Sequence, residues 1–193
     1  MRTFLTSDTH FNHETRERSA LWLGVRRKYF STMQEHSEAL LDNINSLVGR
    51  RDRLVIAGDF AFRRAPYWRQ RIRCSNIVFC IGNHDRYQDS LRAFGRVDTL
   101  RQIRWDGGAL WACHYPMVQW PASHYGSYHA YGHVHDGIEE EMDRLFTNRR
   151  SMDIGVDTAK RLLGEYRPFE LCEFLDLLRD RPGHHPVSRG NHG

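Results

Sequence analysis

The sequence predicts an α/β protein with mixed β-sheets. Short apolar runs typical of buried strands alternate with helical patterns in the first half, and strands follow one another more closely in the second half. The length of 193 residues, with 40% apolar and 27% charged residues, suits one globular domain with a sizeable core. We therefore expect a single domain over residues 1–180. Residues 181–193 contain no apolar anchor, and we expect them to form a disordered tail.

Six short apolar segments are predicted to be strands. They are residues 3–7, 53–57, 77–81, 109–113, 128–131 and 152–156. The clearest helix begins at a capping-box pair, Thr32 and Glu35, continues through apolar residues at helical spacing and ends at Gly49. A second helix is predicted over residues 66–73. A third is predicted over residues 169–179, with Pro168 near its first turn.

Composition excludes a membrane-spanning protein, because no apolar run approaches the roughly 20 residues that a bilayer-crossing helix needs. Asp8 stands where a signal peptide would continue its apolar core, so we expect a cytoplasmic location. The net charge is +4, and only two of the 28 basic residues are lysines. Arginine suits phosphate recognition, although a GC-rich genome explains the same excess equally well.

Polar clusters of Asp, Asn or His follow five of the apolar segments. They are Asp8-Thr9-His10, Gly58-Asp59, Gly82-Asn83-His84-Asp85, His114 and Gly132-His133-Val134-His135. Strand ends in α/β sheets open onto a common crevice, so these clusters can converge there. Their side chains offer oxygen and imidazole donors without a thiolate, which is the donor set that hard-to-borderline divalent metals prefer.

The spacing within two of these clusters supports a metal site. In Asp8-x-His10 and His133-x-His135, residues two apart on a strand would point to the same side and meet one ion or adjacent ions. Each cluster alone is weak, because Gly58-Asp59 also suits a plain turn. All five clusters in this order, each after an apolar segment, favour a metal centre.

The order D-x-H, G-D, G-N-H-D, H, G-H-x-H resembles that of the calcineurin-like metallophosphoesterase superfamily. Residues 6–13 resemble the opening of its small bacterial and phage members, and residues 154–157 followed by Arg167-Pro168 resemble their closing strand and helix. The resemblance covers nearly the whole chain. It is specific for the superfamily and loose about the substrate. It implies a four-layer αββα sandwich, in which two mixed sheets lie face to face with helices outside.

The resemblance also implies roles for individual residues. Two divalent metal ions are expected, Mn²⁺ first, with Fe or Zn²⁺ as alternatives. A hydroxide that bridges the metals would attack phosphorus. His84 matches the catalytic histidine, which stabilises charge or donates a proton to the leaving oxygen. Asp85 either orients His84 or has a structural role in the turn. The implied metal ligands are Asp8, His10 and His135 for one ion, Asn83, His114 and His133 for the other, and Asp59 bridging both.

One departure narrows the substrate class. The large Ser/Thr protein phosphatases of the superfamily follow G-D with a fixed acidic-basic signature, whereas here Asp59 is followed by Phe60-Ala61-Phe62-Arg63-Arg64. This argues against the protein-phosphatase branch. Arg63 and Arg64 are candidates for binding a substrate phosphate, and a solvated basic face is the alternative. His13 is a candidate for lining the substrate pocket, against an ordinary loop histidine.

Three functions are compatible with these features. The leading one is a phosphoesterase that acts on phosphodiesters or small nucleotides. A nuclease acting on DNA or RNA ends is the second, supported by basic clusters at residues 26–28, 50–53 and 69–73 with aromatic residues among them. The third is a non-catalytic scaffold subunit with the same fold, which the retained His84 disfavours. The sequence does not indicate the oligomeric state.

Overall fold

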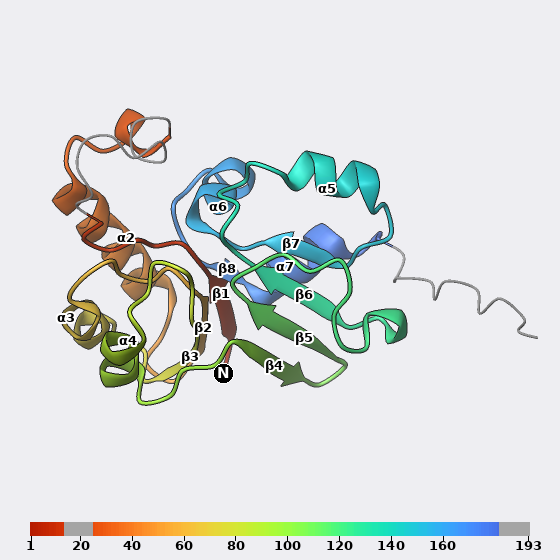
Figure 1. Cartoon of the computed structure of the whole chain (residues 1–193), viewed down its shortest axis with the longest axis horizontal. Coiled ribbons are helices and arrows are strands. Elements are labelled where there is room, and N and C mark those ends of the chain that lie inside the picture. Colours follow the sequence, from red (N-terminus) through yellow and green to blue (C-terminus); the bar gives the residue numbers. More distant parts are fainter. Residues whose placement is uncertain (14–24, 182–193) are drawn as a thin grey trace, which may run out of the picture.

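The computed structural model describes residues 1–13 and 25–181, which contain two four-stranded β-sheets and six α-helices (Figure 1). The strands are β1 (Thr3–Thr6), β2 (Arg53–Ala57), β3 (Asn76–Cys80), β4 (Leu100–Trp105), β5 (Gly108–Cys113), β6 (Tyr128–Tyr131), β7 (Ser151–Asp153) and β8 (Phe169–Glu170). The α-helices are α2 (Met33–Leu47), α3 (Ala65–Arg71), α4 (Tyr87–Phe94), α5 (Glu139–Leu145), α6 (Val156–Leu163) and α7 (Leu171–Leu178). Two short 3₁₀ helices are η1 (Arg26–Lys28) and η2 (Ser123–Tyr125).

Both sheets are mixed, as the sequence predicted. The first has the order β3-β2-β1-β8, in which β1, β2 and β3 are parallel and β8 is antiparallel to β1. The second has the order β4-β5-β6-β7, in which β5, β6 and β7 are parallel and β4 is antiparallel to β5. The parallel strands of each sheet therefore present their carboxyl ends at one edge of that sheet.

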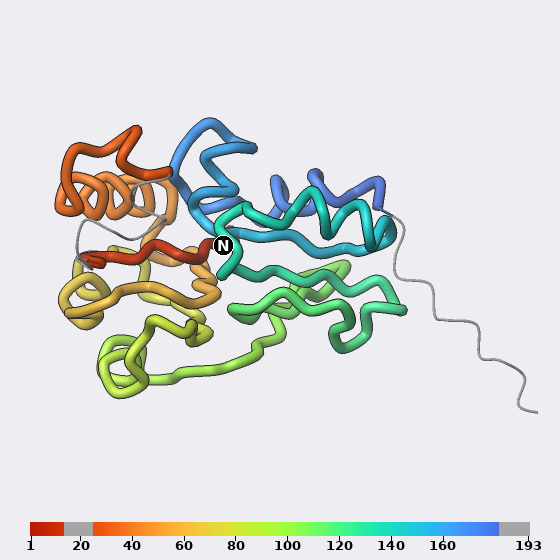
Figure 2. Tube along the Cα trace, turned by 45° about the horizontal axis from the view of Figure 1, so that its top comes forward, coloured from red at the N-terminus to blue at the C-terminus, as the bar shows by residue number. Residues whose placement is uncertain are grey.

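Alternating side chains build a four-layer sandwich, which confirms the predicted fold. On β2, Val55 and Ala57 belong to one core together with Leu110 and Ala112 of β5, so this core lies between the sheets. The alternate residues of β2 belong to a second core with residues of α2 and α3, so these helices cover the outer face of the first sheet. Helix α5 lies over the second sheet. Figure 2 shows the part of the chain that contains β2, β3 and their helices beside the part that contains β4 to β7.

Helix α2 begins as predicted. Thr32 is its N-cap, and the Thr32 hydroxyl accepts a hydrogen bond from the Glu35 backbone N–H at 3.1 Å. The Glu35 carboxylate accepts from the backbone N–H of Ser31 at 2.7 Å, one residue earlier than in a strict capping box. The helix ends at Leu47, two residues before Gly49.

The predicted third helix begins two residues too early. Residues Phe169–Glu170 form β8, where Phe169 pairs with Leu5 of β1, and helix α7 begins only at Leu171 with Glu170 as its N-cap. The predicted strand over residues 152–156 is also too long, because β7 ends at Asp153 and Val156 already begins α6. Strands β4 and β8 and helices α4, α5 and α6 were not predicted. Each of them is short, and the longest has eight residues.

The C-terminal tail was predicted from residue 181 onward, but Arg181 itself is anchored. Its guanidinium pairs with the Asp143 carboxylate at 2.7 Å. The rest of the predicted tail, residues 182–193, lies outside the described residues. Within residues 1–13 and 25–181, no helix has the length and apolarity needed to cross a membrane.

Candidate metal centre

The five polar clusters meet at the carboxyl ends of the parallel strands. Asp8 and His10 follow β1, Asp59 follows β2, and Asn83 and His84 follow β3 of the first sheet. His114 follows β5 of the second sheet, and His133 and His135 follow β6. The two sheets face each other, so both sets of strand ends open onto the same place.

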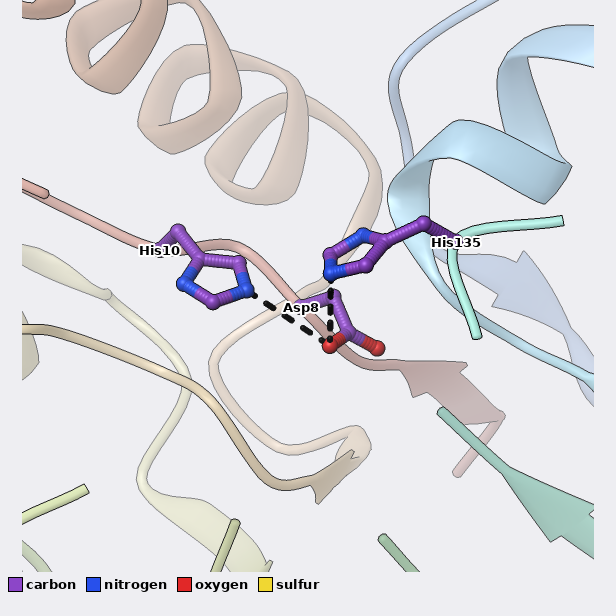
Figure 3. A group of neighbouring side chains, drawn as sticks. All are labelled: Asp8, His10 and His135. Carbon is purple, nitrogen blue, oxygen red and sulfur yellow. Dashed lines mark ion pairs between the residues drawn. The ribbon is translucent and has the colours of Figure 1, made fainter. Parts of the chain in front are cut away.

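Asp8, His10 and His135 form one candidate metal-binding group (Figure 3). The Nε2 atoms of His10 and His135 lie 3.6 and 3.7 Å from the same Asp8 oxygen, Oδ1. Figure 3 shows the two imidazoles converging on this oxygen from different sides. One carboxylate oxygen and two imidazole nitrogens thus surround a common point.

Asp8, Asp59 and His114 form a second group that shares Asp8 with the first. The Asp59 oxygen Oδ2 lies 3.6 Å from His10 Nε2 and 3.4 Å from His114 Nε2. Asp59 therefore stands between a histidine of the first group and a histidine of the second.

Asn83 brings a further oxygen to this side of the site. Its Oδ1 atom lies 2.8 Å from His114 Nε2 and 3.0 Å from His133 Nδ1. All seven residues that the sequence nominated as ligands are therefore neighbours in the structure.

The two aspartates each keep one oxygen directed at the site while backbone N–H groups hold the other. Asp8 Oδ2 accepts from the His133 N–H at 2.9 Å, and Asp59 Oδ1 accepts from the His84 N–H at 2.8 Å. Asp8 Oδ1 and His10 Nε2 are buried and have no hydrogen-bond partner among the described residues. Since buried polar atoms normally have a partner, these two atoms fit a bound cation.

The outer nitrogens of two histidines are held by acceptors. The Nδ1–H of His114 donates to the Ala57 carbonyl at 2.9 Å, and the Nδ1–H of His135 donates to Asp157 Oδ2 at 2.9 Å. With its proton on Nδ1, the neutral form of each ring would present the Nε2 lone pair to the aspartates. Metal-binding histidines are typically oriented in this way.

The two carboxylates of the site favour positive charge on His114. Burial lowers the pKa of His114, but Asp59 and Asp8 more than offset this effect and raise it to about 9. The pKa of Asp59 is lowered, because His114 and His10 outweigh the effect of burial. The same two carboxylates are the groups that would attract a cation to this place.

The expectation that residues two apart lie on a strand was wrong, although Asp8 and His10 do belong to one candidate metal-binding group. Strand β1 ends at Thr6 and β6 at Tyr131, before either pair begins. The ligand candidates lie in turns instead, and five of them have left-handed backbone conformations. Their φ angles are 57° for Asp8, 47° for His10, 49° for Asp59, 75° for His133 and 49° for His135. Non-glycine residues rarely adopt this conformation, and where it recurs it typically marks a functional site.

Two glycines allow the turns to approach one another closely. A Cβ on Gly82 would collide with Asp59 Oδ1, and a Cβ on Gly132 would collide with Ser7 Oγ and Asp8 Oδ2. Both glycines directly precede a ligand candidate. They are required where the backbone of one strand end packs against the aspartate of another.

His84 lies at the solvent-exposed side of the site. Its ring centroid is 5.3 Å from that of His10 and 5.1 Å from that of His13. The Asp85 carboxylate accepts hydrogen bonds from the backbone N–H groups of Asp59 at 2.7 Å, Gly82 at 2.9 Å and Phe60 at 3.0 Å. Asp85 thus ties the β2 and β3 turns together, which favours the turn role over orientation of His84.

Of the three candidate substrate-binding residues, His13 contacts the site, whereas, among the described residues, Arg63 and Arg64 do not. His13 Nδ1 is 2.8 Å from His10 Nδ1, and the His13 ring stacks on Phe62 with centroids 4.5 Å apart. Burial and the neighbouring His10 and His84 lower the pKa of His13 to about 4. Arg63 and Arg64 are exposed, and their guanidinium groups lie over Phe62 and Tyr67. His13 therefore belongs to the site, whereas the structure shows neither arginine in contact with a ligand candidate in the described part of the chain.

Sequence reasoning missed two buried residues behind the site. Arg26 belongs to the basic cluster at residues 26–28 of the sequence, yet it is only 1% exposed and pairs with Asp157 at 2.8 Å. In the sequence, Asp157 stands out only as part of the closing segment at residues 154–157. No sequence pattern links them, because 131 positions separate the two residues.

Comparison with known proteins adds a family match. The family model described as calcineurin-like phosphoesterase matches residues 1–193. A comparison with curated proteins gave no match. A solved structure of a protein of unknown function from Aquifex aeolicus is similar at 20% identity and a TM-score of 0.67, covering 91% of this chain and 98% of its own.

Two more distant solved structures are also similar. One is the phosphoesterase YfcE from E. coli, at 16% identity and a TM-score of 0.43, with 70% of each chain covered. The other is a single mutant of Vps29 from Entamoeba histolytica, at 14% identity and a TM-score of 0.41, covering 70% of this chain and 66% of its own.

Proposed function

The chain belongs to the calcineurin-like phosphoesterase family, and from this premise we propose that it is a two-metal enzyme that hydrolyses phosphodiester or nucleotide phosphoester bonds. The observation that carries this proposal is the position of Asp59. Its Oδ2 atom lies between His10 Nε2 and His114 Nε2, at 3.6 and 3.4 Å. A carboxylate in that position suits a ligand shared by two cations.

We assign the ligands to two groups. Asp8, His10 and His135 would hold one ion, with Asp59 shared. Asn83, His114 and His133 would hold the other. When bound, such ions supply charge neutralisation at the phosphoryl oxygens and a water of lowered pKa. Mn²⁺ is our first choice, and Fe or Zn²⁺ also suit imidazole and carboxylate donors.

His84 and His13 are the residues that this proposal places nearest the substrate. The exposed imidazole of His84 is positioned to donate a proton to the leaving oxygen or to stabilise charge on phosphorus. If His10 Nε2 binds the metal, its Nδ1 carries the proton and donates to His13 Nδ1 at 2.8 Å. Neutral His13 then carries its own proton on Nε2, as a hydrogen-bond donor. Arg63, next to the Phe62 ring that stacks on His13, is the better placed of the two arginines for a distal phosphate.

The nuclease alternative depends on the basic clusters. In the structure, several of their arginines lie apart from one another. Arg26 is buried, and Arg71 pairs with Glu38 at 2.5 Å. Three other arginines, Arg50, Arg69 and Arg73, line a cavity of about 520 Å³. Several residues that line this cavity come directly before β2 and β3 in the chain. That cavity lies at the strand ends opposite the candidate metal centre. These positions favour a short or monomeric substrate over a polymer that follows a basic stripe.

Elemental analysis tests the two-metal proposal. After reconstitution with excess Mn²⁺ and desalting, the wild-type chain should retain close to two ions, and Asp59→Asn should retain one or none. The control is Asp176→Asn, because Asp176 is an exposed residue whose ion pair joins it to Arg179 on the surface. One ion or fewer in the wild type, unchanged in Asp59→Asn, would contradict the proposal.

Hydrolysis of a chromogenic phosphodiester tests the scaffold alternative. Release of nitrophenol should require Mn²⁺ and should disappear in Asp59→Asn but persist in Asp176→Asn. Two bound metals with no turnover on phosphodiesters or nucleotides would favour a scaffold that has kept the metal site.

A further inference from the structure

The ion pair between Arg26 and Asp157 is buried to an unusual degree. The exposed fractions of the two side chains are 2% and 3%. The guanidinium donates from Nε to Oδ1 at 3.1 Å and from Nη2 to Oδ2 at 2.8 Å, which is a two-pronged geometry. Removing both charges from water is costly, and a buried pair is weak evidence for stability alone. The contacts of the pair point to another role.

Arg26 also holds the backbone of the first ligand segment. Its Nη2 donates to the Asp8 carbonyl at 2.6 Å, and its Nη1 lies 3.4 Å from the Thr9 carbonyl. This segment carries the left-handed conformations of Asp8 and His10. Arg26 therefore satisfies carbonyl groups that the turn directs away from the metal centre.

Asp157 holds the ligand candidate from the other sheet. It lies in the first turn of α6, and its Oδ2 accepts from both Arg26 Nη2 and His135 Nδ1–H. The carboxylate offers only acceptors, so it fixes the His135 proton on Nδ1. The Nε2 lone pair is thereby directed toward Asp8 Oδ1, 3.7 Å away.

We propose that Arg26 and Asp157 are positioning residues that preset the Asp8–His135 half of the metal centre before metal arrives. Arg26 sets the backbone of Asp8, and Asp157 sets the ring orientation and proton of His135. The pair thus joins the turn after β1 to the turn after β6 across the two sheets. The proposal rests on the proposed function, because it assumes that Asp8 and His135 bind metal.

The chain provides a matched control in a second buried ion pair. Arg149 and Glu139 lie 3.0 Å apart, with side chains 2% and 5% exposed. Glu139 accepts hydrogen bonds from Arg149 and from the Tyr131 hydroxyl, and neither residue of this pair contacts a ligand candidate in the described part of the chain. Loss of this pair should affect folding to a similar extent without touching the metal centre.

Calorimetric titration with Mn²⁺ compares Asp157→Asn with Glu139→Gln. An amide NH₂ in place of Oδ1 would face the Nε–H donor of Arg26, and in place of Oδ2 it would face the donors of both Arg26 and His135, so at least one contact to Arg26 is lost in either orientation. Asp157→Asn should weaken one of the two Mn²⁺ sites by about 10- to 100-fold, the usual effect of losing an outer partner of a ligand. Glu139→Gln should bind Mn²⁺ as the wild type does, even where both variants unfold at a lower temperature. Equal Mn²⁺ affinity in the two variants would overturn the proposal.

A measurement on the wild type keeps the test independent of how the variants fold. In metal-free protein, at a pH where the His135 imidazole is neutral, the ¹⁵N spectrum should show His135 protonated at Nδ1 and free at Nε2. A proton on Nε2 would refute the positioning role. If the wild type binds no Mn²⁺ at all, the proposed function fails, while the ¹⁵N spectrum still decides whether Asp157 presets His135.

Discussion

At the scale of single residues, the most unusual feature is the backbone of the ligand candidates. Asp8, His10, Asp59, His133 and His135 all have positive φ angles. For a residue with a Cβ this conformation costs roughly 1–2 kcal/mol. The hydrogen bonds that hold the carboxylates and outer ring nitrogens offset this cost, so the side chains converge without being on strands.

Replacement of His84 separates catalysis from metal binding. His84 holds Asp59 through its backbone N–H and not through its side chain. His84→Ala should therefore leave folding and metal content close to the wild type. We expect kcat to fall by roughly 10²- to 10⁴-fold, the usual range for a general acid. The fall should be smaller for nitrophenyl esters than for alkyl esters, because nitrophenolate leaves without protonation. Equal losses for both leaving groups would show that His84 stabilises charge instead of donating a proton.

His129, outside the metal centre, makes stability depend on pH. Burial lowers its pKa from 6.5 to about 4, although its Nδ1–H donates to the Trp111 carbonyl at 2.9 Å. The folded chain keeps this imidazole neutral, whereas the unfolded chain protonates it near pH 6.5. Its contribution is therefore complete above pH 6.5 and is lost as the pH falls toward 4. The full difference corresponds to about 3 kcal/mol.

Urea unfolding at pH 7.5 and pH 4.5 measures this contribution. The difference in unfolding free energy between the wild type and His129→Gln should shrink by about 2–3 kcal/mol at the lower pH, since glutamine does not titrate. The same difference at both pH values would contradict a neutral buried His129. Comparison with the variant cancels the contributions of the other buried histidines.

At the scale of elements, the turns after β1, β2, β3 and β6 pack against one another. Asp85 joins the β2 and β3 turns through backbone N–H groups, and Gly82 lets the β3 turn contact Asp59. The strands determine where the turns begin. The glycines and the Asp85 carboxylate determine how close the turns come.

Gly82→Ala should therefore impair the metal centre without disrupting the sheets. The added Cβ collides with Asp59, so we expect elemental analysis to show fewer than two Mn²⁺ ions per chain, with a near-native circular dichroism spectrum. Gly49→Ala is the control, because a Cβ there meets only the carboxylate of Asp52, at 3.0 Å or more, and no ligand candidate. Full Mn²⁺ content in Gly82→Ala would show that Asp59 can move without losing the ions.

At the scale of the whole molecule, the distribution of arginines decides how a nucleic acid could bind. The clusters at residues 26–28, 50–53 and 69–73 do not form one stripe toward the metal centre, because Arg26 is buried and the cavity between Arg50 and Arg73 lies at the opposite strand ends. Single-stranded oligonucleotide should therefore bind Asp59→Asn with a shallow salt dependence. We expect a log–log slope near −1, as for one phosphate contact at about 0.7–0.9 per contact.

A slope steeper than about −4 would require five or more phosphate contacts and would favour the nuclease function. The inactive Asp59→Asn chain is suited to this measurement because it should not cut the oligonucleotide. Arg50→Ala serves as a local control. If the cavity at Arg50 binds the oligonucleotide, this change alone should make the slope less negative by about 1.

The sequence by itself determined six of the eight strands and the order of the polar clusters. Buried strands need continuous apolar residues, and metal binding needs particular donor atoms. Both can therefore be recognised in short segments of the sequence. Residues 53–57 and 128–131 were predicted as strands with the bounds that the structure shows. The five polar clusters were found for the same reason, and the resemblance to the metallophosphoesterase superfamily indicated the seven ligand candidates within them.

Only the tertiary structure decided which residues support those ligands from behind. Arg26 looked like one of a surface cluster, and burial against Asp157, 131 positions away, gives it a different role. The turn role of Asp85 and the left-handed ligand backbones also depend on contacts between strand ends. Such contacts join residues far apart in the chain, and their energy comes from hydrogen bonds and packing that exist only after the two sheets have met.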